Sequence, residues 1–179
     1  MTPVRFGTDG IRGVAGETIT EEIAAALGRA LGARYPGGTI LIGRDTRKSG
    51  EPLAAALAAG IAGGGARPVD VGVIPTSGLA IITAGDESIA RAVAVTASHN
   101  PAEYNGLKVI GRNGRKIADD EERALEREIE RVLASGGVDA PLRTGGNGAT
   151  VLDGVRIGDG TLIAAGATVT PGTTFGDRV

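Results

Sequence analysis

The chain has 179 residues, of which 41% are hydrophobic and only 2% aromatic, with a formal net charge of −2 and no cysteine. This length fits one ordinary domain with an appendage, and its core must be built from small aliphatic residues. The composition excludes disulfides and thiolate catalysis, and the balanced charge without a basic cluster argues against nucleic-acid or membrane binding.

Helical and extended patterns alternate along the first two thirds of the chain. Thr18 and Glu21 have capping-box spacing, and Ile23, Leu27 and Leu31 recur every four residues, which predicts a helix over about 19–34. Apolar runs and alanine-rich segments predict the next elements: strands at about 39–42, 67–72 and 92–95, and helices at about 51–62 and 75–84.

A hairpin and a charged helix are predicted next. Strands at about 107–110 and 115–117 would turn at Asn113-Gly114. A helix over 119–134 would have one apolar face and a solvated charged face. The alternation predicts an α/β fold with a mainly parallel mixed sheet flanked by helices.

The segment Thr96-Ala97-Ser98-His99-Asn100-Pro101 follows the predicted buried strand at 92–95. It places Ser98 just beyond the strand's carboxyl end, where open α/β sheets bind ligands. Pro101 biases Asn100 away from helical geometry, so the serine is expected on a stiff turn. Taken alone, the segment could also be an ordinary strand-to-loop turn.

Three further segments are rich in residues that handle phosphate: Phe6 to Gly13, Gly43 to Arg47, and Asn105 to Lys108. Together with the segment around Ser98, and in this order, they resemble the first domain of the α-D-phosphohexomutases over about residues 4–135. The first motif is most similar to that of the phosphoglucosamine mutases. The resemblance implies that domain's fold for 1–135.

The resemblance also implies roles for single residues. Ser98 would be phosphorylated in the resting enzyme, giving its phosphate to one sugar oxygen and recovering it from another, and that phosphate would ligate Mg²⁺. Arg12 would approach the phosphoserine, because a guanidinium forks onto phosphate oxygens. Lys108 would assist proton transfer, and His99 would support the loop. A flexible-loop arginine, a solvent-facing lysine and a purely structural histidine are the alternatives.

Five other residues are expected to support the phosphate loops. Arg44 and Asp45 follow the strand at 39–42, so they emerge at a carboxyl end and could brace the serine loop. A mutual salt bridge between them without a catalytic part is the alternative. Thr8, Asp9 and Asn100 complete the set.

The composition changes after Ser135. Residues 136–148 are rich in glycine and are interpreted as a linker. Over 149–179 a period of six begins, with aliphatic or aromatic residues at its first place and glycine at its fourth: Val151, Ile157, Ile163, Val169 and Phe175; Gly154, Gly160, Gly166 and Gly172.

This period resembles the hexapeptide repeat of left-handed β-helices in amino-sugar acyltransferases. A disordered glycine-rich tail is the alternative. The segment lacks the histidine base of those enzymes, because the single histidine lies elsewhere in the chain. Too short to bury its own core, it would be a fusion remnant or a graft that forms a homotrimer.

A complete phosphohexomutase has four domains, and this chain resembles only the first. The Asp-Gly-Asp metal loop, the sugar loop and the phosphate clamp of the other domains have no equivalent here. We therefore expect a truncated phosphoglucosamine mutase that interconverts glucosamine 6-phosphate and glucosamine 1-phosphate only when a partner polypeptide supplies the missing domains. A phosphomannose or phosphoglucose mutase, or a non-catalytic phosphosugar-binding module, are the alternatives. Residues 1–5 lack the apolar run of a signal peptide, so a cytoplasmic location is the default expectation.

Overall fold

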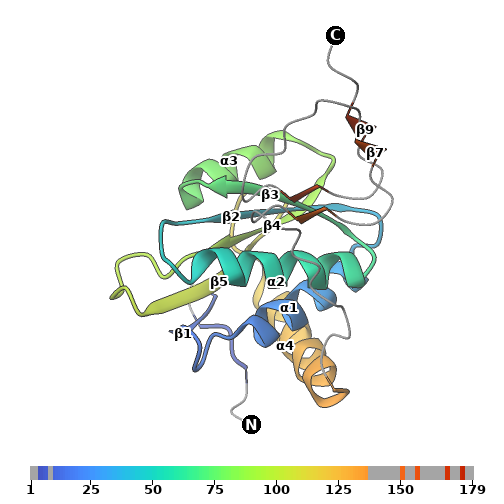
Figure 1. Cartoon of the computed structure of the whole chain (residues 1–179). Helices are drawn as coiled ribbons and strands as arrows, with labels where there is room; N and C mark the ends of the chain where they lie inside the picture. The colour runs from blue at the N-terminus through green and yellow to red at the C-terminus, as the bar shows by residue number, and fades with distance from the viewer. Residues whose placement is uncertain are drawn as a thin grey trace. The chain divides into compact units, whose positions relative to one another are not determined.

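A mixed sheet organises the first of the two units into which the computed structural model divides the chain, Met1–Ala140 and Pro141–Val179 (Figure 1). The structure describes residues 4–7 and 10–136, and in the second unit residues 150–151, 156–157, 168–169 and 174–175. The first unit has five strands in the order β1-β5-β4-β2-β3. Their bounds are Ile11–Val14 (β1), Thr39–Arg44 (β2), Arg67–Val73 (β3), Ile89–Val95 (β4) and Tyr104–Ile110 (β5).

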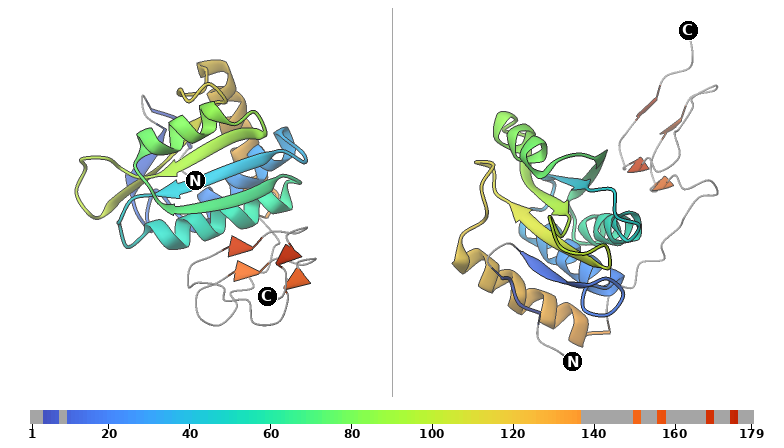
Figure 2. Two further views of the ribbon diagram at one scale, coloured as in Figure 1. Left: turned by 90° about the horizontal axis from the view of Figure 1, so that it is seen from above. Right: turned by 90° about the vertical axis from the view of Figure 1, so that its left-hand side faces the viewer.

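Helices cover both faces of this sheet (Figure 2). Three helices share one hydrophobic core on one face: α1 (Glu21–Arg34), α2 (Gly50–Gly63) and α4 (Asp119–Ala134). The fourth, α3 (Thr76–Gly85), packs on the other face around Leu79. Successive side chains of β2 point to opposite faces of the sheet. Ile40 and Ile42 therefore belong to the first core, and Leu41 belongs to the core on the α3 face.

The predicted sheet was too uniformly parallel. β4, β2 and β3 run parallel, but β5 is antiparallel to β4 and β1 is antiparallel to β5. The connection from β4 to β5 contains no helix, and a short connection of this kind joins antiparallel strands. The mixed sheet flanked by helices is confirmed, and in this sheet β5 runs opposite to the other four strands.

Other predicted elements agree with the structure, with three local differences. Thr20 caps α1, because its side chain accepts a hydrogen bond from the Ile23 N–H, so the helix begins two residues after the predicted start. The predicted strand at 115–117 is reduced to a single bridge between Ile110 and Lys116, although the turn is present. Arg12, expected in a loop, lies in β1.

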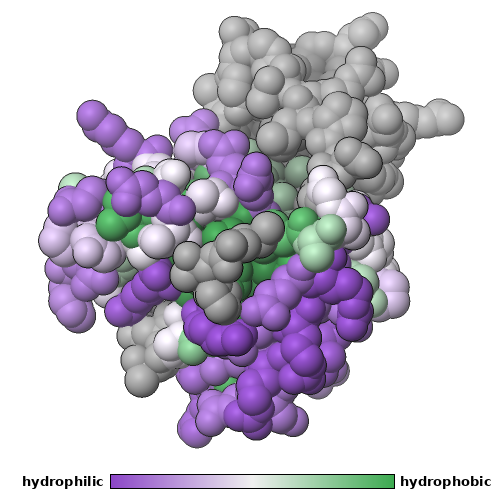
Figure 3. Space-filling view, turned by 90° about the horizontal axis from the view of Figure 1, so that it is seen from below, coloured by the Kyte–Doolittle hydropathy of each residue, from purple (hydrophilic) through white to green (hydrophobic). Residues whose placement is uncertain are grey.

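The charged face predicted for α4 is exposed to solvent. Asp119, Asp120, Arg123 and Arg127 are exposed, whereas Leu125 is buried. Figure 3 shows a largely hydrophilic surface on this side of the first unit. No helix in the described part of the chain is long and apolar enough to cross a membrane.

In the second unit, two pairs of short parallel strands have the same register. Thr150 pairs with Thr168 and Val151 with Val169, and Arg156–Ile157 pairs in the same way with Thr174–Phe175. Both pairs join residues 18 positions apart, which equals three of the six-residue units in the sequence. The β-helix and the exact limits of linker and repeat lie mostly outside the described residues, so they stay predictions.

Helices α1 and α2 approach each other through glycine. A Cβ atom at Gly28 would lie 2.3 Å from the carbonyl oxygen of Leu57, and one at Gly60 would lie 2.0 Å from that of Ala25. Real side chains do not tolerate such distances, so the two backbones can touch only because these positions lack a Cβ. This contact fixes α2, and α2 follows the loop that contains Asp45 and Arg47.

We expect Gly28→Ala to lower the free energy of unfolding by about 2 kcal/mol, because the added methyl group forces the helices apart by overpacking. Urea unfolding followed by far-ultraviolet circular dichroism measures the change. Gly85→Ala in α3 is the matched control, since a Cβ there meets nothing within 4 Å. Equal stability of wild type and Gly28→Ala would contradict the close-contact explanation.

Candidate active site

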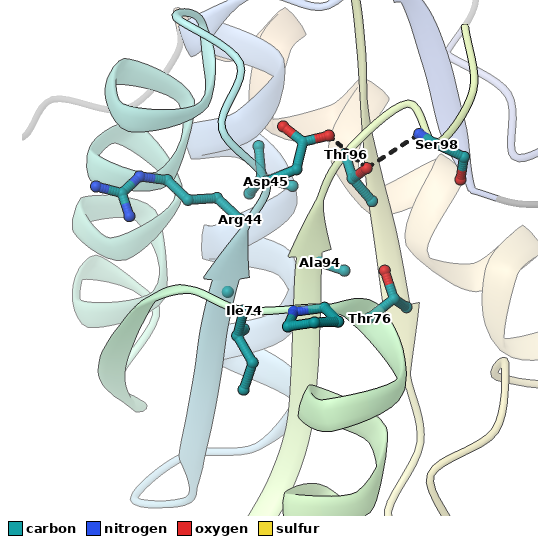
Figure 4. Close-up of a pocket in the computed structure, with 10 residues that line it drawn as sticks. Arg44, Asp45, Ile74, Thr76, Ala94, Thr96 and Ser98 are labelled. Atoms are coloured by element: carbon teal, nitrogen blue, oxygen red, sulfur yellow. Dashed lines mark hydrogen bonds between the residues drawn. The ribbon is translucent and has the colours of Figure 1, made fainter.

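A cleft opens where the carboxyl ends of β2 and β4 meet the amino-terminal end of α3 (Figure 4). Its volume is about 210 Å³. It is lined by Gly43 to Asp45, Ile74 to Thr76, Ala94 to Thr96, and Ser98. The cleft therefore lies at the edge of the sheet where α/β proteins place their ligands.

Ser98 lies three residues beyond the end of β4, on a turn that bulges from the sheet. Its side chain is exposed and its backbone φ is +55°, the only positive φ among the described non-glycine residues. This left-handed conformation is disfavoured for residues with a Cβ atom and costs about 1–2 kcal/mol. The Ser98 N–H donates a hydrogen bond to Thr96 Oγ1 at 3.0 Å.

Arg47 holds the loop from the β2 side. Its guanidinium donates hydrogen bonds to the carbonyl oxygens of Ser98 at 3.0 Å, Asn100 at 2.8 Å and Tyr104 at 3.0 Å, and also to that of Pro101. Only 12% of the Arg47 side chain is exposed. One partly buried cation thus satisfies three carbonyls of the loop between β4 and β5 and a fourth on Tyr104, the first residue of β5.

Asp45 joins Arg47 to the residue before the serine turn. Its Oδ2 atom pairs with Arg47 Nε at 3.0 Å and accepts the hydroxyl proton of Thr96 at 2.6 Å. Its Oδ1 atom accepts the backbone N–H of Arg47 at 3.0 Å. The Thr96 hydroxyl therefore donates to Asp45 while it accepts from Ser98, as Figure 4 shows.

Arg12 and Lys108 come from the antiparallel half of the sheet. Arg12 pairs with Gly106, and a Cβ at Gly106 would lie 2.9 Å from Arg12 Cγ and 2.9 Å from the Thr96 carbonyl oxygen. The Arg12 side chain therefore lies against Gly106, where β5 has no side chain to oppose it. Lys108 pairs with Ala94 and alternates with the buried Leu107, which places it on the same sheet face as the cleft.

Arg44 does not brace the serine loop. Its side chain lines the cleft but points away from Ser98 (Figure 4), and the ion pair that Asp45 makes is with Arg47. Among the described residues, no hydrogen bond reaches the buried Arg44 Nη1. Its positive charge acts on Asp70: burial raises the pKa of Asp70, and the Gly72 N–H and Arg44 oppose that rise.

The remaining predicted residues have different positions. His99 is exposed on the serine turn, and Asn100 is half-buried, with its N–H donating to the Ala97 carbonyl. Thr8 and Asp9 lie outside the described residues. Among the described residues, no group of three histidine, cysteine or acidic side chains could hold a metal ion, so Mg²⁺ has no ready-made ligand set there.

Thr96 and Arg47 are the residues that sequence reasoning missed. Both lie inside the segments that predict phosphate chemistry, but the sequence pattern points to Arg44 instead of Arg47 and indicates no role for Thr96. One signal was available, since Thr96 is the first hydroxyl residue after an apolar strand. The partners of Arg47 are backbone carbonyls 51 to 57 positions away, which no local pattern reveals.

Comparison with known proteins places this geometry in a family. Residues 3–135 match the family described as phosphoglucomutase/phosphomannomutase, alpha/beta/alpha domain I. Phosphoglucosamine mutase of Thermotoga neapolitana is 50% identical over 125 residues, covering 70% of this chain and 28% of the relative. That of Rubrobacter xylanophilus is 52% identical over 122 residues, covering 68% and 27%. The chain thus spans less than a third of these relatives.

Solved structures agree in fold. A putative phosphomannomutase from Thermus thermophilus aligns with a TM-score of 0.64 and 37% identity, over 72% of this chain and 30% of the other. A phosphoglucomutase/phosphomannomutase family protein from Burkholderia thailandensis aligns with a TM-score of 0.65 and 31% identity, over 74% and 31%.

We expect Thr96→Val to lower the free energy of unfolding by about 2 kcal/mol, because it leaves the Asp45 carboxylate and the Ser98 N–H each short of one hydrogen bond. Valine has the shape of threonine, so packing changes little. Thr96→Ser keeps the hydroxyl, so its free energy of unfolding should fall by less than half as much as that of Thr96→Val. Chemical unfolding curves of the three proteins give the comparison, and equal losses for valine and serine would show that the methyl group matters instead.

Proposed function

The chain belongs to the phosphoglucomutase/phosphomannomutase family, with its α/β/α domain I at residues 3–135, and on that premise we propose that Ser98 carries a phosphoryl group between two oxygens of a phosphosugar. The observation that carries the proposal is the exposed hydroxyl residue at the cleft, which has a left-handed backbone conformation. An ordinary turn has no need of a strained serine at that place.

In the proposed reaction, the bond between phosphorus and Ser98 Oγ breaks as a sugar hydroxyl oxygen bonds to phosphorus. The proton of that hydroxyl passes, with the assistance of Lys108, to the Ser98 oxygen. Arg12 lies against Gly106 on the sheet face of the cleft and would bind phosphate oxygens. Phosphoryl transfer through a loose transition state depends mainly on such positioning and charge stabilisation. His99 and Asn100 would support the same turn, and Asp45 holds it.

We propose an amino sugar as the substrate, with exchange between glucosamine 6-phosphate and glucosamine 1-phosphate. The support is the 50–52% identity to phosphoglucosamine mutases from two bacteria. A phosphomannose or phosphoglucose substrate is the second candidate, because the Thermus thermophilus neighbour carries the name phosphomannomutase. A non-catalytic phosphosugar-binding module is the third.

We propose that turnover also uses the domains that make up the rest of these relatives. The cleft of about 210 Å³ is smaller than the roughly 300–1,000 Å³ of pockets that enclose small ligands. The chain covers under a third of its relatives, so we propose that the remaining domains complete the site, with a partner polypeptide as one source of them. Mg²⁺ would then be held partly by the phosphate on Ser98, with its other ligands from outside the described residues, where it would stabilise charge on the phosphoryl group.

For residues 149–179 we propose an assembly role. The 18-residue register of both strand pairs equals three six-residue units, as one turn of a hexapeptide β-helix requires. Pairs of two-residue strands are marginal alone, so association with other copies would stabilise them. This supports the homotrimer over the fusion remnant.

Light scattering on the full chain should therefore give a mass about three times its 17.8 kDa. Ile157→Asp, which puts a charge at the first place of a six-residue unit, should return the chain to a monomer without changing the unfolding of the first unit. A monomeric wild type would remove the assembly proposal and favour the fusion remnant.

Intact mass and peptide mapping test the central proposal on protein purified from its own host. We expect one phosphoryl group on Ser98, absent in Ser98→Ala and retained in Ser88→Ala, which changes another exposed serine. Full-length protein without phosphate at Ser98 would favour the binding module, and phosphate on a different residue would contradict the proposed role of Ser98.

A further inference from the structure

Both backbone polar groups of Ser98, its N–H and its carbonyl oxygen, form hydrogen bonds to side chains. Its N–H donates to Thr96 Oγ1, and its carbonyl oxygen accepts from Arg47 Nη2, each at 3.0 Å. These two partners differ in origin, because Thr96 follows β4 and Arg47 belongs to the loop between β2 and α2. The torsion between the two held groups is the one that takes the left-handed value.

The two partners meet on one atom. Thr96 Oγ1 donates to Asp45 Oδ2 at 2.6 Å, and Arg47 Nε donates to the same Oδ2 at 3.0 Å. A closed ring therefore runs from the Ser98 N–H through Thr96, Asp45 and Arg47 to the Ser98 carbonyl. A ring of this kind restricts the φ and ψ angles of Ser98 more than either hydrogen bond alone, because both peptide groups are tied to one carboxylate.

The ring is rigid at its base. Asp45 N donates to the Val95 carbonyl, and Thr96 N donates to the Gly106 carbonyl, so both are anchored to the sheet. Arg47 is anchored by its own N–H on Asp45 Oδ1 and by the carbonyls of Asn100 and Tyr104. The turn must therefore adapt to the ring, and the residue at its centre takes the strained conformation.

We propose that the Arg47–Asp45–Thr96 ring is a conformational clamp that forces Ser98 into the left-handed region and thereby sets the direction of its hydroxyl. Arg47 acts through the backbone of Ser98, so it is a positioning residue and not a catalytic one. The clamp itself depends only on the contacts above. Its consequence for phosphoryl transfer rests on the proposed function.

A thermodynamic cycle distinguishes a clamp from an arginine that only holds the loop together. In the full chain with Arg47, Ser98→Gly should raise the folding equilibrium constant about threefold, because glycine adopts a positive φ without strain. In Arg47→Gln the turn can relax, so Ser98→Gly should give no gain or a small loss. The helix signal in circular dichroism reports both unfolding curves, since the four helices in the described part of the chain lie in the first unit.

Arg91→Gln is the matched control. Arg91 is also on the sheet and also ion-paired, but with Glu121, far along β4 from the serine turn. The change in unfolding free energy caused by Arg91→Gln should add to that caused by Ser98→Gly. If the unfolding free-energy changes of Arg47→Gln and Ser98→Gly were also additive, the clamp would be overturned. If Arg47→Gln does not fold, Thr96→Val opens the ring at its other side and takes its place in the cycle.

Nuclear magnetic resonance reads the torsion directly. Backbone chemical shifts and the coupling between the amide and α protons of Ser98 should report a positive φ in wild type and a negative φ in Arg47→Gln and Thr96→Val. A positive φ retained in both variants would overturn the clamp, even if their stability falls.

Phosphate occupancy of Ser98 in protein from its own host then tests the consequence. Arg47→Gln should carry at most about a tenth of the wild-type phosphate, since a displacement of about 1 Å can cost a factor of about 100 in rate. Arg91→Gln should keep the wild-type level. Unphosphorylated wild type would defeat the proposed function, whereas the clamp would still stand or fall on the cycle and the torsion. Equal occupancy in wild type and Arg47→Gln would overturn the positioning role.

Discussion

One guanidinium group holds the candidate site together. The loop between β4 and β5 leaves the sheet, and it contains Ser98, Asn100 and Pro101, while Tyr104 is the first residue of β5. Arg47 supplies hydrogen bonds to the carbonyl groups of all four, and its own charge is matched by Asp45. A lysine could not do this, because an ammonium group has three donors and no planar fork. The serine turn therefore keeps one shape without regular secondary structure.

The topology explains why these groups come together. The sheet is parallel on one side of β4 and antiparallel on the other, so β4 has β2 as one neighbour and β5 as the other. The loop after β2 brings Asp45 and Arg47, which brace the backbone of the turn. The antiparallel half brings Arg12 and Lys108 on the sheet face of the cleft. Bracing and positive charge thus come from opposite sides of the strand that leads to Ser98.

Local patterns explain how much of this was readable in the sequence. Apolar runs located β2 and β4, helical spacing located α1 and α4, and an apolar strand followed by Ser98 located the carboxyl-end crevice. The pairing of Asp45 with Arg47 instead of Arg44 depends on which way each side chain leaves the end of β2, which adjacent positions do not reveal. The positive φ of Ser98 was also unreadable, because glycine or asparagine is the usual signal for it. The capping-box spacing of Thr18 and Glu21 predicts a helix start near residue 19, whereas in the structure Thr20 caps α1 and the helix begins at Glu21.

The hydrogen bonds that hold Ser98 in its strained conformation all lie within the first unit. All the hydrogen bonds that hold the turn join residues between Asp45 and Gly106, so this geometry exists before any substrate or further domain arrives. A serine fixed in advance spares the reaction the entropy of ordering it. The cleft, by contrast, is small and closed on one side only by Ile74 to Thr76 and the sheet. Holding the serine turn and enclosing a ligand are therefore separate tasks, and the residues that hold the turn all lie within the first unit.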